Sequence, residues 1–335
     1  MKKVYLDNFI HNIENIREYI KHIELVNNIS KNKNSLHEEF LQEFNIHLRE
    51  FTISKKEFEY KAIIISLYGI LENTISEWIQ EHIENISRIV SDYTTLNENF
   101  RKEHFSRSIN LIDLINKNRH SKFESINKES IVQKLNQIII GTDDFKLNSE
   151  AYIPLSGNIR HSKIEEAFKP LDIDLNFLKN TFHQEIIKID DLVGRRNDIA
   201  HGVQIDNILG ITEFEDFISA LQRYMINLFN ILSEKEVEYE FKQLKDSNPS
   251  CLIYIDETKE VFMQNKVCIV NIKDTEIKIG DILFFEKNNK FLKTTLLSIK
   301  EKDTPIESSN NGELGLKLDT SIKKNSRIWK KIICK

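Results

Sequence analysis

The chain has 335 residues, 40% of them hydrophobic and 30% charged, and a formal net charge of −5 at pH 7. It is long enough for two domains and has ample core-forming residues for an ordinary soluble protein. The net negative charge argues against general binding to polyanions. A content of only 9 Gly and 4 Pro argues against a turn-rich all-β fold and favours long helices.

No export signal, membrane span, metal or cofactor is expected. Residues 1–3 lead into an amphipathic segment, and the longest apolar run, residues 62–71, is too short to cross a bilayer. Cys251, Cys268 and Cys334 lack CxxC spacing, so neither a zinc site nor a disulfide framework is expected. We therefore expect a cytoplasmic protein.

Apolar residues recur at helical spacing through most of the chain up to residue 245. The predicted helices cover residues 5–29, 36–51, 54–89, 99–118, 126–140, 162–168, 174–183, 187–201 and 212–245. Ser54 and Glu57 form a capping box for the third of these, and Thr212 caps the last. Because residues 60–71 are apolar on nearly all sides, this helix should be the most buried. Polar residues 142–158, with Pro154 and Gly157, predict a loop.

The hydrophobic period changes after the polar stretch at residues 246–250. Short β-rich runs follow at residues 251–255, 261–263, 266–270, 281–285, 292–299, 314–318 and 327–333. The predicted fold class is mainly α, with a helical domain at residues 1–246 and a small all-β barrel at residues 251–335. The second domain has 16 Lys and Arg against 12 Asp and Glu. This basic balance predicts either contact with nucleic acid or an acidic partner, or a plain solvated surface.

The sequence Arg196-Asn197-Asp198-Ile199-Ala200-His201 stands at the end of a predicted helix. Arginine, an amide and histidine so close together are suited to handling phosphate, and Asn197 and His201 share a helix face. Taken singly, each residue also has a structural interpretation. His201 could cap the helix end, and Arg196 could pair with Asp190 or Asp191.

This string, with the Gly202 that follows it, resembles the R-x4–6-H signature of HEPN domains. Residues 61–72 resemble the preceding helix of toxin-like HEPN proteins, in which an apolar run and an aromatic residue lead to a glutamate, here Glu72. The resemblance covers roughly residues 1–245 and implies a helical bundle with endoribonuclease activity that needs no metal. Glu72 could instead be a carboxylate at the rim of the core.

The resemblance also implies residue roles. His201 would be the acid/base, Arg196 would bind the phosphate and stabilise the transition state, and Asn197 would orient the phosphate or His201. Asp198 and Glu72 would support them. Histidine suits proton transfer near neutral pH, and the fork of an arginine matches phosphate oxygens. The expected products are a 2′,3′-cyclic phosphate and a 5′-hydroxyl.

The chain holds one convincing copy of the motif, and HEPN ribonucleases commonly dimerise so that two motifs line one cleft. We therefore expect a homodimer with a composite site. Two other Arg/His clusters, at residues 119–120 and 158–161, do not match the motif spacing and are expected to lie at the surface or contact RNA.

The β-rich region carries a second resemblance, to domain 2 of elongation factor Tu and related translation GTPases. It rests on residues 277–284, 294–299, 311–318 and 326–329. No GxxxxGK[ST] sequence occurs in the chain, so it contains no P-loop GTPase. The resemblance implies that the barrel directs the protein to tRNA or the ribosome; support of folding or dimerisation, or protein docking, is the alternative.

These patterns favour a HEPN endoribonuclease of the toxin or phage-defence type that cleaves tRNA or translation-associated RNA. Such an enzyme would be held in check by an antitoxin or another regulatory partner. The alternative is a dimeric adaptor that binds RNA or the translation machinery without cleaving it.

Overall fold

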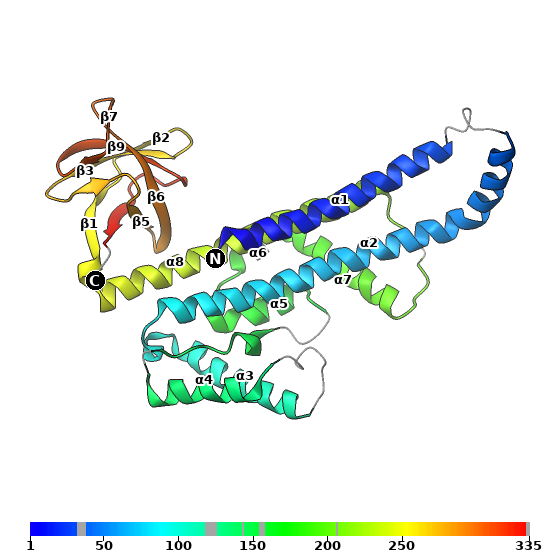
Figure 1. Ribbon diagram of the computed structural model, residues 1–335, viewed down its shortest axis with the longest axis horizontal. Helices are drawn as coiled ribbons and strands as arrows, with labels where there is room; N and C mark the ends of the chain where they lie inside the picture. The colour runs from blue at the N-terminus through cyan, green and yellow to red at the C-terminus, as the bar shows by residue number, and fades with distance from the viewer. Residues whose placement is uncertain (32–37, 118–125, 143, 154–157, 206, 333–335) are drawn as a thin grey trace. The chain divides into compact units, whose positions relative to one another are not determined.

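A computed structural model describes residues 1–31, 38–117, 126–142, 144–153, 158–205 and 207–332. A helical region is followed by an antiparallel β half-barrel (Figure 1), so the predicted fold class is confirmed. The α-helices are α1 (Lys3–Lys31), α2 (Glu38–Ile89), α3 (Glu98–Asn116), α4 (Lys128–Ile140), α5 (His161–Phe168), α6 (Asn176–Thr181), α7 (His183–Ala200) and α8 (Ile211–Ser247). Short 3-10 turns are η2 (Tyr93–Thr95), η4 (Ser149–Tyr152), η5 (Lys169–Leu171) and η6 (Pro249–Cys251). No helix in the described part is long and apolar enough to cross a membrane.

The protein forms two compact units. Unit 1 consists of residues 1–84, 97–139 and 147–230, and unit 2 consists of residues 85–96, 140–146 and 231–335. Both long helices, α2 and α8, contribute residues to each unit. The domain boundary at residues 246–251 stays a prediction.

Two predicted helix caps were wrong. Helix α2 is continuous through the break expected at residues 51–54, so Ser54 is inside a helix and caps none. Without Gly or Pro there, the small intrinsic penalty of Thr and Ser does not interrupt a strongly helical sequence. Helix α8 begins at Ile211, which places Thr212 inside its first turn. The carboxylate of Glu213 accepts the Gly210 N–H at 2.8 Å and satisfies this helix start instead.

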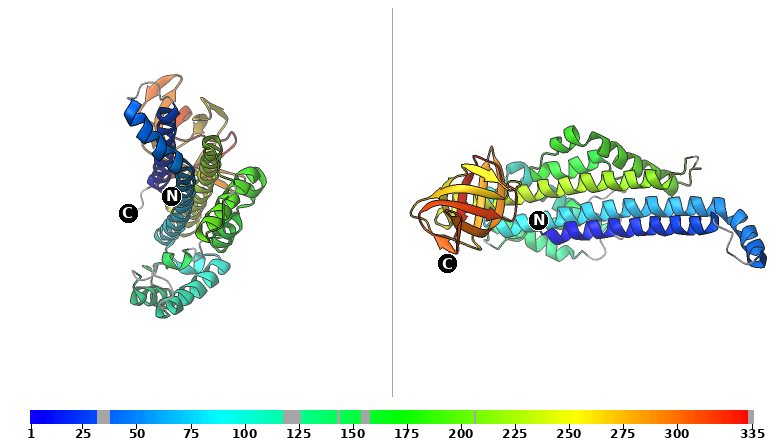
Figure 2. Two further views of the ribbon diagram at one scale, coloured as in Figure 1. Left: turned by 90° about the vertical axis from the view of Figure 1, so that its right-hand side faces the viewer. Right: turned by 90° about the horizontal axis from the view of Figure 1, so that it is seen from above.

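The core of unit 1 is built on the apolar run of α2, as expected. Ile64, Leu67 and Leu71 are fully buried. Helix α1 lies along α2 (Figure 1 and the right-hand view of Figure 2), with the ring of Phe9 6.0 Å from that of Trp78. The expectation of burial on nearly all sides fails at Ile65, which is 51% exposed.

Helices α3 and α4 pack as a pair within unit 1 (Figure 1). The predicted loop at residues 142–158 contains η4, which docks against α3. Asn148 anchors it, since its backbone N–H donates to Nε2 of His104 at 2.9 Å and its side-chain amide donates to Ser108 at 3.0 Å. Pro154 and Gly157 lie outside the described residues.

Unit 2 contains the antiparallel half-barrel, visible in both views of Figure 2. Its strands are β1 (Leu252–Glu257), β2 (Glu260–Phe262), β3 (Val267–Ile272), β4 (Ile277–Lys278), β5 (Ile282–Lys287), β6 (Lys290–Glu301), β7 (Thr304–Ile306), β8 (Ser308–Ser309), β9 (Gly312–Leu318) and β10 (Arg327–Lys331). The main sheet has the order β1-β10-β5-β6-β9-β3-β2, with β7 on β6, and β4 pairs with β8. Every β-rich run predicted from the sequence is a strand. The missed strands β4, β7 and β8 have two or three residues, too few to show alternation.

The end of α8 belongs to the same core as the sheet. Phe241 is buried against the rings of Phe284, Phe291 and Trp329. Glu240, one residue earlier, pairs with Lys293 and Lys331, each at 2.7 Å. Unit 2 therefore includes helical residues as well as strands.

The cysteines differ from the expectation in one respect. Cys268 is buried and free, whereas Cys251 is disulfide-bonded. The Ile332 N–H donates to the Cys251 carbonyl at 2.8 Å, because β10 returns beside β1. Sheet pairing thus creates a proximity that spacing along the sequence does not show.

Candidate functional site

The motif lies at the C-terminal end of α7, and the backbone there is firmly fixed. The His201 N–H donates to the Asn197 carbonyl at 2.9 Å, and Gly202 takes the left-handed conformation at φ +67°. The Gly202 N–H then donates to the Ile199 carbonyl at 3.2 Å, and the Val203 N–H donates to the Asp198 carbonyl at 2.9 Å. This is a Schellman closure, which needs glycine at the left-handed position. Helix α7 begins four residues before the predicted start and ends at Ala200, one residue before the predicted end, so His201 is the capping residue just after its last turn.

The two neighbouring arginines have different environments. Arg195 pairs with the Asp191 carboxylate at 3.1 Å and donates to the Tyr60 hydroxyl at 3.0 Å. Arg196 makes no ion pair with any described residue, and its guanidinium carbon lies 4.8 Å from the centre of the Tyr68 ring. The salt-bridge interpretation considered for Arg196 therefore applies to Arg195, and the charge of Arg196 remains available to a ligand.

Tyr68 connects Arg196 electrostatically to Glu72. Burial raises the pKa of the Tyr68 hydroxyl, the negative charge of Glu72 raises it further, and the positive charge of Arg196 lowers it. Tyr68 and Glu72 are one helical turn apart on α2, and Tyr68 is only 3% exposed. The buried ring therefore supports the arginine, and Glu72 is close enough to affect the pKa of the Tyr68 hydroxyl.

Asn197 is held by a residue far away in the sequence. Its amide nitrogen donates to the side-chain oxygen of Asn158 at 2.6 Å. The Arg196 guanidinium donates to the side-chain oxygen of Asn197 at 3.3 Å. Arg196, Asn197 and Asn158 thus form one chain of hydrogen bonds, and both asparagines are linked to the charge of Arg196.

The other predicted site residues are exposed. The side chains of His201 and Asp198 are open to solvent at the end of α7 and make no hydrogen bond or ion pair with a described residue. The structure therefore brings together Arg196 and Asn197 on one side, and Tyr68 and Glu72 beneath Arg196. His201 and Asp198 face solvent next to them in the chain.

The expectation for the cluster at residues 158–161 was partly wrong. Asn158 and Arg160 are exposed, but His161 is buried, with its ring Nδ1 2.9 Å from the Tyr224 hydroxyl. Burial lowers the pKa of His161 and raises that of Tyr224. His161 is the first residue of α5, and its ring packs against Tyr224 of α8, so this histidine is part of the core. The cluster at residues 119–120 lies outside the described residues.

Tyr68, the aromatic residue of the HEPN-like helix, and Asn158, in the cluster at residues 158–161, were not assigned contacts with the motif from the sequence. Tyr68 lies one helical turn before Glu72 in the predicted helix at residues 61–72, and this spacing indicates that the two side chains are neighbours. No such spacing marks Asn158, because only the tertiary fold brings it to Asn197. Among the described residues, no group of three or more His, Cys, Asp or Glu could hold a metal ion.

A family model described as RiboL-PSP-HEPN matches residues 7–234. The chain belongs to the RiboL-PSP-HEPN family. HEPN domains as a family are associated with RNA cleavage or RNA binding. The resemblance of residues 1–245 to HEPN domains is confirmed at this level. The R-x4-H motif, Tyr68 and Glu72 all lie within the matched residues.

Comparison with curated proteins finds no match. Two solved structures are similar to part of this HEPN protein, both of the C-terminal domain of a protein described as a Geobacillus thermoleovorans U32 peptidase. One has 10% identity and a TM-score of 0.21 and covers 24% of this chain and 92% of its own. The other, a selenomethionine variant, has 9% identity and a TM-score of 0.20 and covers 22% and 95%. Scores this low carry no argument about this chain, and the resemblance to elongation factor Tu stays a prediction.

Proposed function

We propose that the protein is an endoribonuclease of the toxin or phage-defence type that needs no metal. Its reaction is carried by Arg196, Asn197 and His201. The observation behind this proposal is the state of Arg196: it is held over the Tyr68 ring, without an ion-pair partner among the described residues. A structural arginine would be neutralised by a carboxylate, as Arg195 is.

The residue types suit cleavage by the ribose 2′-hydroxyl. That hydroxyl attacks the phosphorus and loses its proton to a base, and the 5′-oxygen leaves with a proton from an acid. The products are a 2′,3′-cyclic phosphate and a 5′-hydroxyl. Histidine is the side chain that performs both transfers near neutral pH. Arg196 stabilises the charge that develops on the phosphorane, and Asn197 orients the phosphate.

Glu72 and Asp198 support these residues without contacting the reacting atoms. Glu72 acts through Tyr68, since its charge and the buried hydroxyl influence each other beneath Arg196. Asp198 stands between the catalytic residues in the chain. Its exposed carboxylate orients the acid/base histidine when RNA is bound.

The site is completed in a homodimer. The end of one α7 helix supplies one arginine and one histidine, which cannot easily make all of these contacts, so each site combines residues of both copies. If Arg196 of one copy works with His201 of the other, a mixture of Arg196→Ala and His201→Ala chains regains one intact site per mixed dimer. We expect roughly a quarter of wild-type activity from a fully exchanged equimolar mixture, and none from either variant alone. A mixture as inactive as its components contradicts the shared site.

The substrate we propose is tRNA or another translation-associated RNA in the cytoplasm, selected with help from the basic half-barrel. Cleavage of such RNA stops growth, so an antitoxin or other regulatory partner restrains the enzyme.

Sequencing of RNA ends tests the activity and its substrate together. Cells expressing the wild-type protein should accumulate 2′,3′-cyclic phosphate ends, concentrated in one RNA class, that are absent with His201→Ala or Arg196→Ala. Purified wild-type protein should make the same cuts in EDTA, and each variant should lose about 100-fold or more in rate. Because His201 is exposed, its variant should melt at the wild-type temperature. Equal cutting by wild type and both variants, or RNA binding without cutting, contradicts the nuclease. The second result identifies the alternative, a non-catalytic RNA-binding adaptor.

A further inference from the structure

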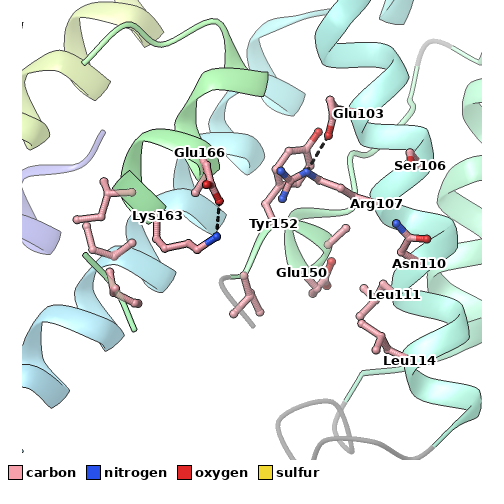
Figure 3. A pocket seen from close by; sticks show the side chains of 16 residues that line it. Glu103, Ser106, Arg107, Asn110, Leu111, Leu114, Glu150, Tyr152, Lys163 and Glu166 are labelled. Carbon is pink, nitrogen blue, oxygen red and sulfur yellow. Dashed lines mark hydrogen bonds and ion pairs between the residues drawn. The ribbon is translucent and has the colours of Figure 1, made fainter. Parts of the chain in front are cut away.

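Unit 1 contains a pocket of about 380 Å³ between α3 and α5. Its wall on one side is α3, its wall on the other side is α5, and η4 lies between them (Figure 3). This volume is within the range of small-molecule sites, about 300–1,000 Å³. The proposed chemistry at Arg196 and His201 does not use this pocket.

The charged groups of the pocket are paired with one another. Arg107 contacts Glu103 at 3.2 Å, and Lys163 contacts Glu166 at 2.6 Å, both drawn in Figure 3. Glu150 is paired with Lys134 at 3.2 Å. Three carboxylates and two cations line the pocket, so an anion would meet an excess of negative charge. The charge balance therefore favours an uncharged ligand.

The remaining lining suits a flat group with polar edges. Aliphatic side chains cover much of the wall: Ile75, Leu111, Leu114, Ile153, Ile159 and Ile164. The polar groups of Ser106 and Asn110 are exposed at the α3 side and make no side-chain hydrogen bond with a described residue. Arg107 is fixed with its guanidinium carbon 5.2 Å from the centre of the Tyr152 ring. An amide pairs with base edges, and an ordered guanidinium stacks on bases.

The pocket and the motif share one segment of the chain. Asn158 bonds to Asn197, while Ile159, the next residue, is buried and lines the pocket. Arg160 follows, and its guanidinium lies against α7 beside Gly194. The segment at residues 158–160 therefore connects the end of α7 that carries the motif to the wall of the pocket.

We infer that this pocket binds the base of a nucleotide next to the cleaved bond and so sets the sequence preference of the enzyme. The inference rests on the proposed ribonuclease function and adds a subsite to it. Asn110 reads the edge of the base, the aliphatic wall covers its faces, and the sugar and phosphates remain outside, toward α7.

The test compares cleavage of RNA oligonucleotides by the full-length protein and two variants. Asn110→Leu removes the amide and keeps the size of the side chain, and Ser106→Trp fills the pocket. Asn99→Leu is the matched control, because Asn99 is exposed on α3, about 16 Å along the helix from Asn110, and does not line the pocket. Cleavage of a random single-stranded pool first gives the preferred base at each position for the wild type.

The second step uses the preferred oligonucleotide and a copy that is abasic at the preferred position. Wild type and Asn99→Leu should cut the abasic copy at least about tenfold more slowly than the intact RNA. Asn110→Leu and Ser106→Trp should cut both at the same slow rate, with wild-type melting temperatures.

The outcomes separate this inference from the proposed function. If His201→Ala cuts every RNA that wild type cuts, or if wild type cuts none, the proposed ribonuclease function is contradicted. If wild type cuts but both pocket variants keep its base preference, the base subsite is overturned and the nuclease stands. If they keep the preference and lose binding to a co-expressed inhibitor protein, the pocket holds a protein side chain, which also overturns the subsite.

Discussion

The guanidinium of Arg196 lies over the ring of Tyr68: its central carbon is 4.8 Å from the centre of that buried ring. A cation over an aromatic face is attracted by about 0.5–2 kcal/mol, with the larger values where water is excluded. This contact fixes the arginine and leaves its N–H groups unneutralised. An arginine held in this way can bind an anion, whereas an arginine that only stabilises the fold is paired with a carboxylate.

Replacing Tyr68 should therefore impair cleavage through Arg196. Tyr68→Leu removes the ring, and we expect single-turnover cleavage to slow by about tenfold, equivalent to about 1.4 kcal/mol of transition-state stabilisation. Tyr68→Phe keeps the ring face and should stay within about twofold of wild type. Thermal melting of both variants accounts for any loss of folded protein. A Leu variant that cleaves as fast as the Phe variant would show that the ring contact is incidental.

The adjacent arginines should respond in opposite ways to the same substitution. Arg195→Lys loses contacts to Asp191, Tyr60 and the Asn207 carbonyl. It should lower the free energy of unfolding by about 1–2 kcal/mol and change cleavage little. Arg196→Lys breaks no ion pair with a described residue, so the fold should keep its stability while cleavage falls by about tenfold or more. Urea unfolding and single-turnover cleavage on both proteins check this, and the reverse pattern would reassign the functional arginine.

Much of this arrangement follows from local sequence, and the rest does not. The left-handed conformation of Gly202 ends α7, and helical periodicity predicts the burial of the apolar run around Leu67. Both features depend on local sequence. The α2 break was expected at Ser54 because a capping pattern also occurs inside helices, where neighbouring residues outweigh it. The partners of Arg195 and Asn197 lie far away in the chain. Neither spacing nor composition distinguishes which arginine is paired.

The link between Asn158 and Asn197 should be measurable as a coupling. Each side chain contributes to one hydrogen bond of 2.6 Å, and Asn197 also accepts from Arg196. Asn158→Ala and Asn197→Ala should each slow cleavage, and the double variant should be less impaired than the product of the two single effects. We expect a coupling of about 0.5–1.5 kcal/mol from the four single-turnover rates. Strictly multiplicative effects would show that Asn158 does not position Asn197.

The stability of unit 1 should fall in mild acid because of His104. Its Nε2 accepts the Asn148 N–H at 2.9 Å and the ring is fully buried, so the folded state holds a neutral imidazole. Burial, and then the charge of Lys134, lower the pKa of His104 to about 4. An unfolded histidine titrates near 6.5. Below that pH His104 binds a proton in the unfolded chain but stays neutral in the folded chain. The free energy of unfolding therefore decreases as the pH falls from about 6.5 to 4, by up to about 3 kcal/mol.

Trp78 makes this effect measurable in unit 1. The chain has 2 tryptophans, Trp78 and Trp329, so a Trp329→Phe background leaves the buried Trp78 as the single fluorescent reporter of its unit. Urea unfolding at pH 7.5, 6 and 5 should show decreasing stability in this background. His104→Gln should be less stable at pH 7.5, because Asn148 loses a well-placed acceptor, but its stability should vary less with pH. His22→Gln, at an exposed position, should retain the full pH dependence. An equal pH dependence in the His104 and His22 variants would assign the effect to other groups.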